Sequence, residues 1–186
     1  DILNYETQCV SFVLFDEVDK YPDYTGKEAD PISLGEERTK TFWNRKIYKV
    51  STPTIELGPI WKAYQNCDVR KEYYVPCPYC GHYQQFKFTQ IKWPEGERNP
   101  QIVRDAAWYE CEKSRGIIED KHKDQMLRYG EWRAENEPET RVIRSVGYHL
   151  NSIYSPWITF GEVAAEFLSS KDHPEKLRNF VNSWLG

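Results

Sequence analysis

Residues 12–17 read Phe12-Val13-Leu14-Phe15-Asp16-Glu17, and this hexapeptide decides how the N-terminal part of the chain is interpreted. Four apolar residues in a row are typical of a parallel strand that is buried on both faces. The two acids follow where such a strand leaves the core. Because ligands of open α/β sheets bind outside the carboxyl ends of the strands, Asp16 and Glu17 are candidate site residues.

The hexapeptide also fits a Walker B pattern, which ends in the acids of a nucleotide hydrolase. In that interpretation Asp16 holds the Mg²⁺ ion that bridges the phosphates of ATP. Glu17 points to the other side of the strand and orients or deprotonates the attacking water. The alternative is a buried strand that ends in a polar turn, which is common in α/β proteins.

The following residues predict a strand–helix–strand–helix order. Asp30-Pro31 predicts the N-cap and first turn of a helix that runs to about Phe42. Residues 46–50 predict a second strand, and Thr54 is placed to cap a helix that ends near Asn66. This order indicates a parallel α/β sheet.

The second strand ends in Ser51-Thr52-Pro53-Thr54. In helicase-like and packaging ATPases this position carries the motif that couples the γ-phosphate to movement, so Ser51, Thr52 and Thr54 are candidate nucleotide contacts. Arg38, on the intervening helix, is a further candidate for a phosphate contact. The alternatives are ordinary turn and cap residues and, for Arg38, a solvated helix face.

No phosphate-cradling loop of the form Gly-x-x-x-x-Gly-Lys-Ser/Thr occurs among the ten glycines, and Gly26-Lys27-Glu28 lacks both the first glycine and the hydroxyl. We therefore expect the phosphate-binding lysine upstream of residue 1. The chain, which starts without Met, is expected to be a fragment that hydrolyses no ATP alone. A parallel sheet without its P-loop strand is also expected to expose an edge and an apolar face.

A more specific pattern is Cys77-Pro78-Tyr79-Cys80, with proline before it and glycine after it. A Cys-x-x-Cys on a tight turn directs two thiolates to one tetrahedral ion, and Cys111 offers a third ligand. A second pair is expected after Cys111, but its partner position holds Ser114, a poor zinc ligand.

The fourth ligand is left open between His82, His122 and water, and loss of the metal is a further alternative. A redox pair is less favoured because no thioredoxin-like helix begins at the cysteines. The structural alternative is two reduced cysteines in an aromatic hairpin. Cys9 and Cys67 have no predicted role.

The rest of the chain is predicted more coarsely. From Tyr73 to about Trp108 we expect short β pieces, and the aromatic stretch 148–157 favours packing over base stacking. The later elements expected are a helix over 119–129, a strand over 146–150 that returns to the main sheet, a capping box at Thr159–Glu162 that opens a helix, and a last helix from Pro174 to Leu185.

Composition limits the possible functions. The net charge of −4 argues against a nucleic-acid binder that works by bulk charge, and 39% hydrophobic residues exclude a disordered tail. No apolar run approaches the roughly 20 residues of a membrane helix, so no membrane partner is expected.

Taken together, the motifs resemble the lambda-type (GpA) family of phage terminase large subunits. The matching pieces occur in that family's order: residues 15–22, Arg38 with residues 39–42, Ser51–Thr54, Tyr74–Gly81, Tyr109–Cys111, Gly130–Trp132, Gly147–Asn151, Tyr154–Trp157 and Phe180–Asn182. They cover nearly the whole chain.

The resemblance implies an α/β fold, a partial P-loop (ASCE) ATPase parallel sheet with a small β-rich, zinc-ribbon-like insertion. Residues 1–72 would belong to the ATPase core, residues 73–130 to the cysteine knuckle, and residues 131–186 to a return to the core and a helical linker. Asp16 would be the magnesium carboxylate, Glu17 the catalytic glutamate, and Ser51–Thr54 the coupling motif.

It also implies a working cycle. The cofactors would be ATP and Mg²⁺, with Zn²⁺ at the knuckle, and the partners double-stranded DNA, a terminase small subunit and the portal of the procapsid in the host cytoplasm. The working motor would be a homo-oligomer, and a nuclease beyond residue 186 would cut the genome. Ser114 and Arg115 depart from the Cys and Gly usual in the family, which bears directly on the zinc.

Two other classes of function remain. One is a non-catalytic zinc-ribbon module that binds protein or DNA, and the other is a nucleic-acid helicase. A helicase shares the Walker B and coupling motifs but does not account for the later aromatic and cysteine motifs.

Overall fold

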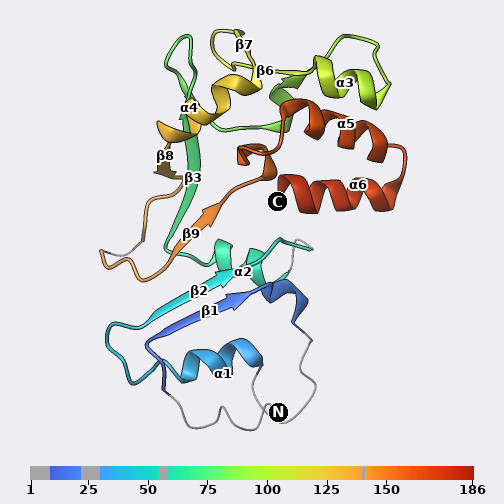
Figure 1. Cartoon of the computed structure of the whole chain (residues 1–186). Helices are drawn as coiled ribbons and strands as arrows, with labels where there is room; N and C mark the ends of the chain where they lie inside the picture. Colours follow the sequence, from blue (N-terminus) through green and yellow to red (C-terminus); the bar gives the residue numbers. More distant parts are fainter. Residues whose placement is uncertain (1–8, 22–29, 55–57, 140) are drawn as a thin grey trace. The chain divides into compact units, whose positions relative to one another are not determined.

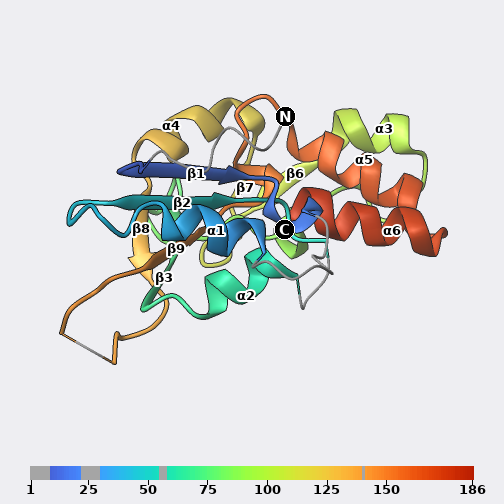
Figure 2. The same ribbon diagram turned by 90° about the horizontal axis from the view of Figure 1, so that it is seen from below.

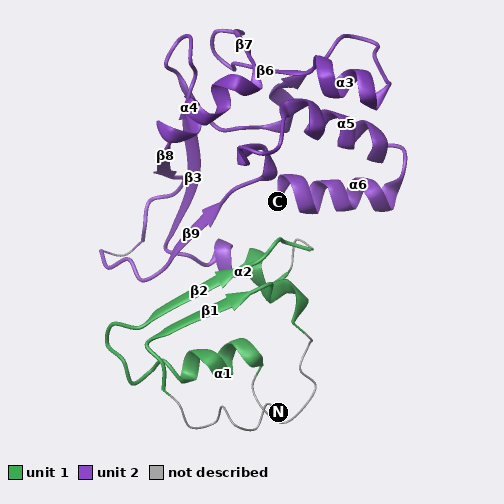
Figure 3. Cartoon of the chain, in the orientation of Figure 1, with its two compact units in different colours: residues 1–62 green, residues 63–186 purple. Residues whose placement is uncertain are grey.

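A computed structural model of the chain describes residues 9–21, 30–54, 58–139 and 141–186 (Figure 1). These residues form a mixed α/β structure with both parallel and antiparallel strand pairs. The chain divides into two compact units, residues 1–62 (unit 1) and residues 63–186 (unit 2) (Figure 3).

Unit 1 is built on two parallel strands, β1 (Phe12–Asp16) and β2 (Lys46–Val50). The connecting helix α1 (Pro31–Glu37) lies along the strands in both views (Figures 1 and 2). A short 3-10 turn, η2 (Val18–Lys20), follows β1, and α2 (Pro59–Gln65) follows β2. The predicted strand–helix–strand–helix order is therefore confirmed.

The start of α1 follows from its first residues. Asp30 Oδ1 accepts hydrogen bonds from the backbone N–H groups of Ile32 and Ser33 at 3.0 and 3.1 Å, as an N-cap does. The helix ends at Glu37, before the expected end near Phe42. A methyl group added at Gly35 would lie 2.5 Å from Phe15 Cζ, so glycine permits the close approach of the helix to β1.

One face of the unit 1 sheet is exposed. Phe15, on the side of α1, is 7% exposed, whereas Phe12 and Leu14 are each 57% exposed. Tyr48 and Val50 of β2 are 46% and 52% exposed. The expectation that β1 is buried on both faces is wrong, and the expectation of an exposed apolar face is confirmed. We call these four exposed side chains the apolar face.

Unit 2 contains a sheet centred on β3 (Val69–Pro76). This strand pairs antiparallel with β4 (Tyr83–Gln84) and β8 (Glu131–Ala134), and parallel with β9 (Val146–His149). The strand expected over 146–150 therefore forms, but it pairs with β3 rather than with β1 or β2. β3 also runs through the expected boundary after residue 72.

A second, three-stranded sheet contains β5 (Ile91–Lys92), β6 (Trp108–Glu110) and β7 (Ile117–Ile118). A helix, α3 (Pro100–Ala106), lies between β5 and β6, where only β pieces were expected. Its start carries a recognisable signal, because the Asn99 side chain accepts a hydrogen bond from Gln101 N and proline occupies the first turn. The expectation of β pieces alone between Tyr73 and about Trp108 was wrong.

The helices of unit 2 largely match the prediction. The Thr159–Glu162 capping box is formed at the start of α5, with Glu162 N donating to Thr159 Oγ1 at 3.0 Å and Thr159 N donating to Glu162 Oε2 at 2.8 Å. The remaining elements are η3 (Phe88–Gln90), η4 (Asp120–His122), α4 (Lys123–Arg128), η5 (Ser152–Tyr154), α5 (Phe160–Ser170), α6 (Pro174–Phe180) and the π-helical turn η6 (Val181–Leu185).

The core of unit 2 is aromatic. Phe86, Tyr109 and Phe160 are buried, and their ring centroids lie 5.1 to 5.6 Å apart. α5, which begins at Phe160, packs on α3 and on α6 (Figures 1 and 2). None of the helices in the described residues is long and apolar enough to cross a membrane.

Candidate nucleotide and metal sites

The two acids of the hexapeptide lie at the carboxyl end of β1. Asp16, the last residue of the strand, is exposed. Glu17 has a left-handed backbone, with φ 56° and ψ 40°, which costs a non-glycine residue on the order of 1–3 kcal/mol. Lys20 Nζ lies 2.7 Å from Glu17 Oε2, but this ion pair is exposed and therefore weak. Strain of this kind concentrates at functional sites.

Asp19 connects the carboxyl ends of the two strands. Its backbone N–H donates to Ser51 Oγ at 3.2 Å. Its carboxylate oxygen Oδ2 accepts from the Thr54 N–H at 2.9 Å and from the Thr54 hydroxyl at 3.1 Å. The other oxygen, Oδ1, accepts from Ile60 N at the start of α2 at 2.7 Å. One side chain therefore joins η2, the end of β2 and α2.

Sequence reasoning missed this connection. It assigned Thr54 as the cap of the following helix, but α2 begins at Pro59 and the side-chain oxygen near its start comes from Asp19. The signal available was a further acid in Asp16-Glu17-Val18-Asp19, which had no assigned role. Gly26-Lys27-Glu28 lies outside the described residues.

The predicted phosphate contact Arg38 lies at the other end of the strands. Its backbone carbonyl accepts a hydrogen bond from Val10 N at 3.1 Å, next to the amino end of β1. At a rise of about 3.3 Å per residue, Val10 and Asp16 are roughly 20 Å apart. Ser51, Thr52 and Thr54 do follow the carboxyl end of β2. The hydroxyl residues therefore lie at the same end of the strands as Asp16 and Glu17, whereas Arg38 lies at the opposite end.

The first cysteine knuckle is the turn between β3 and β4. Gly81 N donates to Cys77 O at 2.9 Å, and Cys77 N donates to His82 O at 2.8 Å. Gly81 has φ 68°, a conformation that glycine adopts without cost. The turn brings the Cys80 side chain back toward Cys77, as a metal knuckle requires.

The second knuckle is the turn between β6 and β7, and it repeats the first. Arg115 N donates to Cys111 O at 3.0 Å, and Cys111 N donates to Gly116 O at 3.0 Å. Arg115 has φ 58°, the counterpart of Gly81. Cys111 thus stands in the place of Cys77, and Ser114 in the place of Cys80.

The knuckles bring three sulfurs together. The Sγ atoms of Cys77, Cys80 and Cys111 all lie within 4.8 Å of one another, and those of Cys80 and Cys111 are 3.8 Å apart. Two sulfurs each about 2.3 Å from a tetrahedral zinc would also be about 3.8 Å apart, so the residues fit such an ion. In the described part of the chain, no histidine or carboxylate completes this set at the same distance.

The predicted histidine ligand is engaged elsewhere. His82 Nε2 lies 2.8 Å from Glu112 Oε1, and the structure does not bring this ring to the sulfurs. The alternative ligand His122 accepts a hydrogen bond from Glu119 N on Nδ1 at 3.2 Å. The three cysteines predicted as ligands meet, whereas the predicted His82 does not join them.

The thiols differ in their electrostatic surroundings. Cys77 and Cys111 are buried, whereas Cys80 is exposed. A backbone hydrogen bond from His82, helped by the Ser114 hydroxyl, lowers the pKa of Cys80 to about 7. Burial raises the pKa of Cys77.

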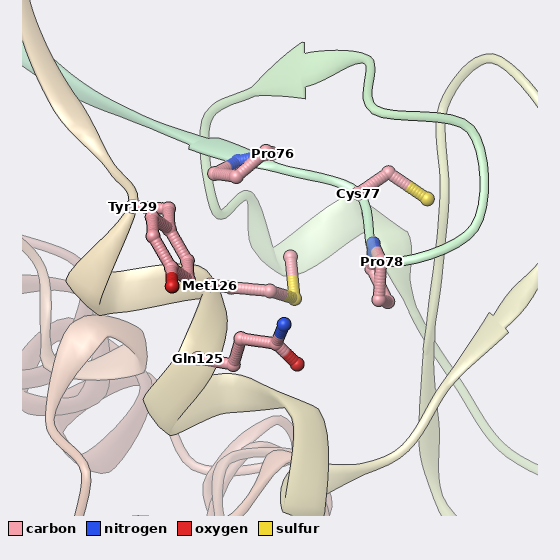
Figure 4. A pocket seen from close by; sticks show the side chains of 6 residues that line it. All are labelled: Pro76, Cys77, Pro78, Gln125, Met126 and Tyr129. Carbon is pink, nitrogen blue, oxygen red and sulfur yellow. The ribbon is translucent and has the colours of Figure 1, made fainter.

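A shallow pocket adjoins the first knuckle (Figure 4). It is lined by Pro76, Cys77, Pro78, Gln125, Met126 and Tyr129. Cys77 therefore belongs both to the pocket lining and to the sulfur cluster, and its sulfur points away from Met126 and Gln125 (Figure 4).

The chain is a mixed α/β protein. In unit 1, an acidic segment that follows β1 is hydrogen-bonded to the hydroxyl residues that follow β2. Unit 2 carries the pair of cysteine knuckles. The chain belongs to the phage terminase large subunit family. The family model described as "Phage terminase large subunit gpA, ATPase domain" matches residues 2–132, which confirms the resemblance inferred from the motifs.

A second family model, "Terminase large subunit gpA, endonuclease domain", matches residues 145–186. This match begins inside the segment that was expected to be a core return and linker. The predicted nuclease domain beyond residue 186 is not shown, and the endonuclease model already matches residues within this chain.

Curated relatives agree with the family models. The terminase large subunit of Enterobacteria phage P21 is 30% identical over 200 residues, and that of Escherichia phage lambda is 26% identical over 198 residues. Each alignment covers 98% of this chain and 31% of the relative, so the chain spans about a third of their length. No solved structure matches the chain.

Proposed function

We propose that this chain is part of the ATPase motor of a terminase large subunit that packages double-stranded DNA into procapsids. The motor would use ATP and Mg²⁺ in the host cytoplasm, as a homo-oligomer that works with a terminase small subunit and the portal. The family membership supports this proposal. The endonuclease match over residues 145–186 supports a second activity, genome cutting, in the same full-length protein.

The observation that carries the proposal is the Asp19 bridge. A motor must link nucleotide chemistry at one strand end to movement of another segment. Asp19 lies three residues after Asp16 and bonds directly to Ser51 and Thr54, the predicted coupling residues. Hydrogen bonds to a carboxylate are stronger than those between neutral groups, so displacement of one strand end is transmitted to the other.

The residues at this site have the chemistry that the reaction needs. Asp16 offers exposed carboxylate oxygens, the ligands that Mg²⁺ prefers, and this ion when bound would neutralise phosphate charge. Glu17 would orient the attacking water and accept its proton. Ser51, Thr52 and Thr54 would respond to loss of the γ-phosphate, whereas Arg38 is left out because of its place at the amino end of β1.

We also infer that Cys77, Cys80 and Cys111 bind Zn²⁺, which would hold the two short hairpins together. Each hairpin is closed by only two strand residue pairs at its turn, so a bound metal would add a direct link between the two turns. The repeated knuckle geometry also favours the second candidate function, a non-catalytic zinc-ribbon module that binds protein or DNA.

The deciding experiment compares DNA-stimulated ATP hydrolysis by the full-length protein with its Glu17→Gln variant. Loss of the base should lower turnover by at least about 100-fold while nucleotide binding is retained. Glu37→Gln, which removes an exposed carboxylate on α1, is the matched control and should keep its activity. Unchanged turnover in Glu17→Gln would refute the ATPase assignment. Loss of DNA or partner binding on replacement of Cys77 would then favour the zinc-ribbon module.

A further inference from the structure

The two cysteine knuckles are copies of one structure with a single difference in metal-ligating chemistry. In each, a strand pair closes on a turn, with Pro76 paired to Tyr83 in the first hairpin and Glu110 paired to Ile117 in the second. Both turns carry the same two backbone hydrogen bonds and one residue of positive φ. The two turns have four corresponding side-chain positions; three of them hold thiols, whose sulfurs lie within 4.8 Å of one another.

The fourth of these corresponding positions is occupied by Ser114. Its backbone N–H donates to Cys111 Sγ at 3.5 Å, as expected for a knuckle residue beside a ligand sulfur. Its hydroxyl oxygen accepts from Gly116 N at 3.3 Å. Ser114 therefore occupies, in the second knuckle, the position that Cys80 occupies in the first, next to the Cys111 sulfur.

We propose that the knuckle pair binds a soft divalent metal ion through Cys77, Cys80 and Cys111 alone and leaves the coordination position beside Ser114 open to an exchangeable ligand. A neutral hydroxyl is a poor ligand for such an ion, so Ser114 would hydrogen-bond a metal-bound water or small donor rather than bind the metal. This inference rests on the proposed zinc site and specifies its fourth position.

The residues around the open coordination position beside Ser114 favour exchange of its ligand. Cys80 is exposed, so solvent reaches the cluster from that side. His82, the nearest predicted substitute, is paired with Glu112. The Tyr79 ring, which is exposed, flanks this position, because a methyl group added at Gly116 would lie 3.1 Å from Tyr79 Cδ2 and 3.2 Å from Ser114 Oγ. The open position would accept water, an imidazole or a small thiol.

The test is titration of the 186-residue chain with Co²⁺, whose absorption reports the number of thiolate ligands. The wild type should bind one Co²⁺ with three-thiolate charge-transfer intensity, and added imidazole should shift its visible bands. Ser114→Cys should raise the intensity by about a third, tighten binding roughly tenfold or more, and abolish the response to imidazole. Lys40→Cys, which adds a thiol in unit 1, should behave as the wild type does.

The possible failures are distinguishable. Absence of Co²⁺ and Zn²⁺ binding by the wild type would overturn both the zinc site and the open position. Binding that is insensitive to imidazole, with the same spectrum before and after Ser114→Cys, would leave the metal in place but overturn the open position. Competition with a chelator measures the Zn²⁺ affinity of the wild type and of Ser114→Ala, and so tests whether the Ser114 hydroxyl binds the metal directly. Much weaker affinity in Ser114→Ala would show that the hydroxyl is itself the ligand, against the proposal.

Discussion

The carboxylate of Asp19 accepts hydrogen bonds from both the backbone N–H and the hydroxyl of Thr54, at 2.9 and 3.1 Å, across 35 residues of sequence. The same carboxylate accepts from Ile60 N at 2.7 Å, so it joins η2 to the end of β2 and to the start of α2. In the proposed motor Asp19 would be a positioning residue, because it bonds to the predicted coupling residues Ser51 and Thr54.

Replacing Asp19 by Asn should uncouple hydrolysis from movement. The amide keeps one acceptor but presents an N–H group to the N–H of Thr54 or Ile60, so part of the bridge is lost. We expect DNA-stimulated kcat in the full-length protein to fall about tenfold, with the KM for ATP changed by less than about threefold. The packaging rate should fall further than the hydrolysis rate.

The control for Asp19 is Glu37→Gln, an exposed carboxylate in the same unit that bonds only to its neighbour Lys40 among the described contacts. Equal losses of kcat and nucleotide affinity in Asp19→Asn would point to general misfolding of unit 1. An unchanged ratio of packaging to hydrolysis would refute the positioning role.

Glu17 should be a position where stability and activity conflict. Its left-handed backbone is strained in Glu and in Gln, whereas glycine adopts it freely at some cost in unfolded-state entropy. We expect Glu17→Gly to be more stable than Glu17→Gln by about 1 kcal/mol in urea unfolding. Both variants should lack hydrolysis in the full-length protein. Equal stability of the two variants would indicate that the backbone at residue 17 is relaxed.

Lys123 should make unit 2 more stable at alkaline pH. Its side chain is 2% exposed, and Nζ donates to Ser155 O at 3.2 Å and to Ile158 O. Burial lowers its pKa from 10.5 to about 8. Between these values the unfolded chain binds the extra proton, so the free energy of unfolding rises with pH, by about 1.4 kcal/mol for each unit of pKa difference at most.

The check is urea unfolding of the wild type and Lys123→Met at pH values below and above 8. Because other groups also titrate there, the informative quantity is the difference between the two proteins. That difference should move in favour of the wild type as pH rises. Parallel curves would mean that Lys123 keeps its ordinary pKa in the folded state.

The apolar face of unit 1 should drive self-association of the chain. Leu14→Lys places a charge on this face at an exposed position, so its effect on stability should stay within about 1 kcal/mol. Sedimentation should show less self-association for Leu14→Lys than for the wild type. Trp43→Lys, at a site that is also exposed but lies outside the four residues of the face, is the control. The same reduction in both variants would count against this face as the contact.

Local signals predicted several elements correctly. Asp30-Pro31 and Thr159–Glu162 carry their own capping chemistry, and both helices begin there. The family also followed from the order of short motifs. By contrast, Asn99-Pro100 also has the residues of a helix start, but this pair was not used in the prediction, and α3 was missed.

The sequence by itself determined what depends on neighbouring residues: the helix starts, the apolar strand that ends in Asp16 and Glu17, the Cys77–Cys80 pair and the family. Only the tertiary structure decided which distant groups meet. It bonded Asp19 to Thr54, brought the Cys111 sulfur to those of Cys77 and Cys80, and left Arg38 near the amino end of β1. Such contacts depend on strand register and loop closure, and residue order along the chain does not encode them locally.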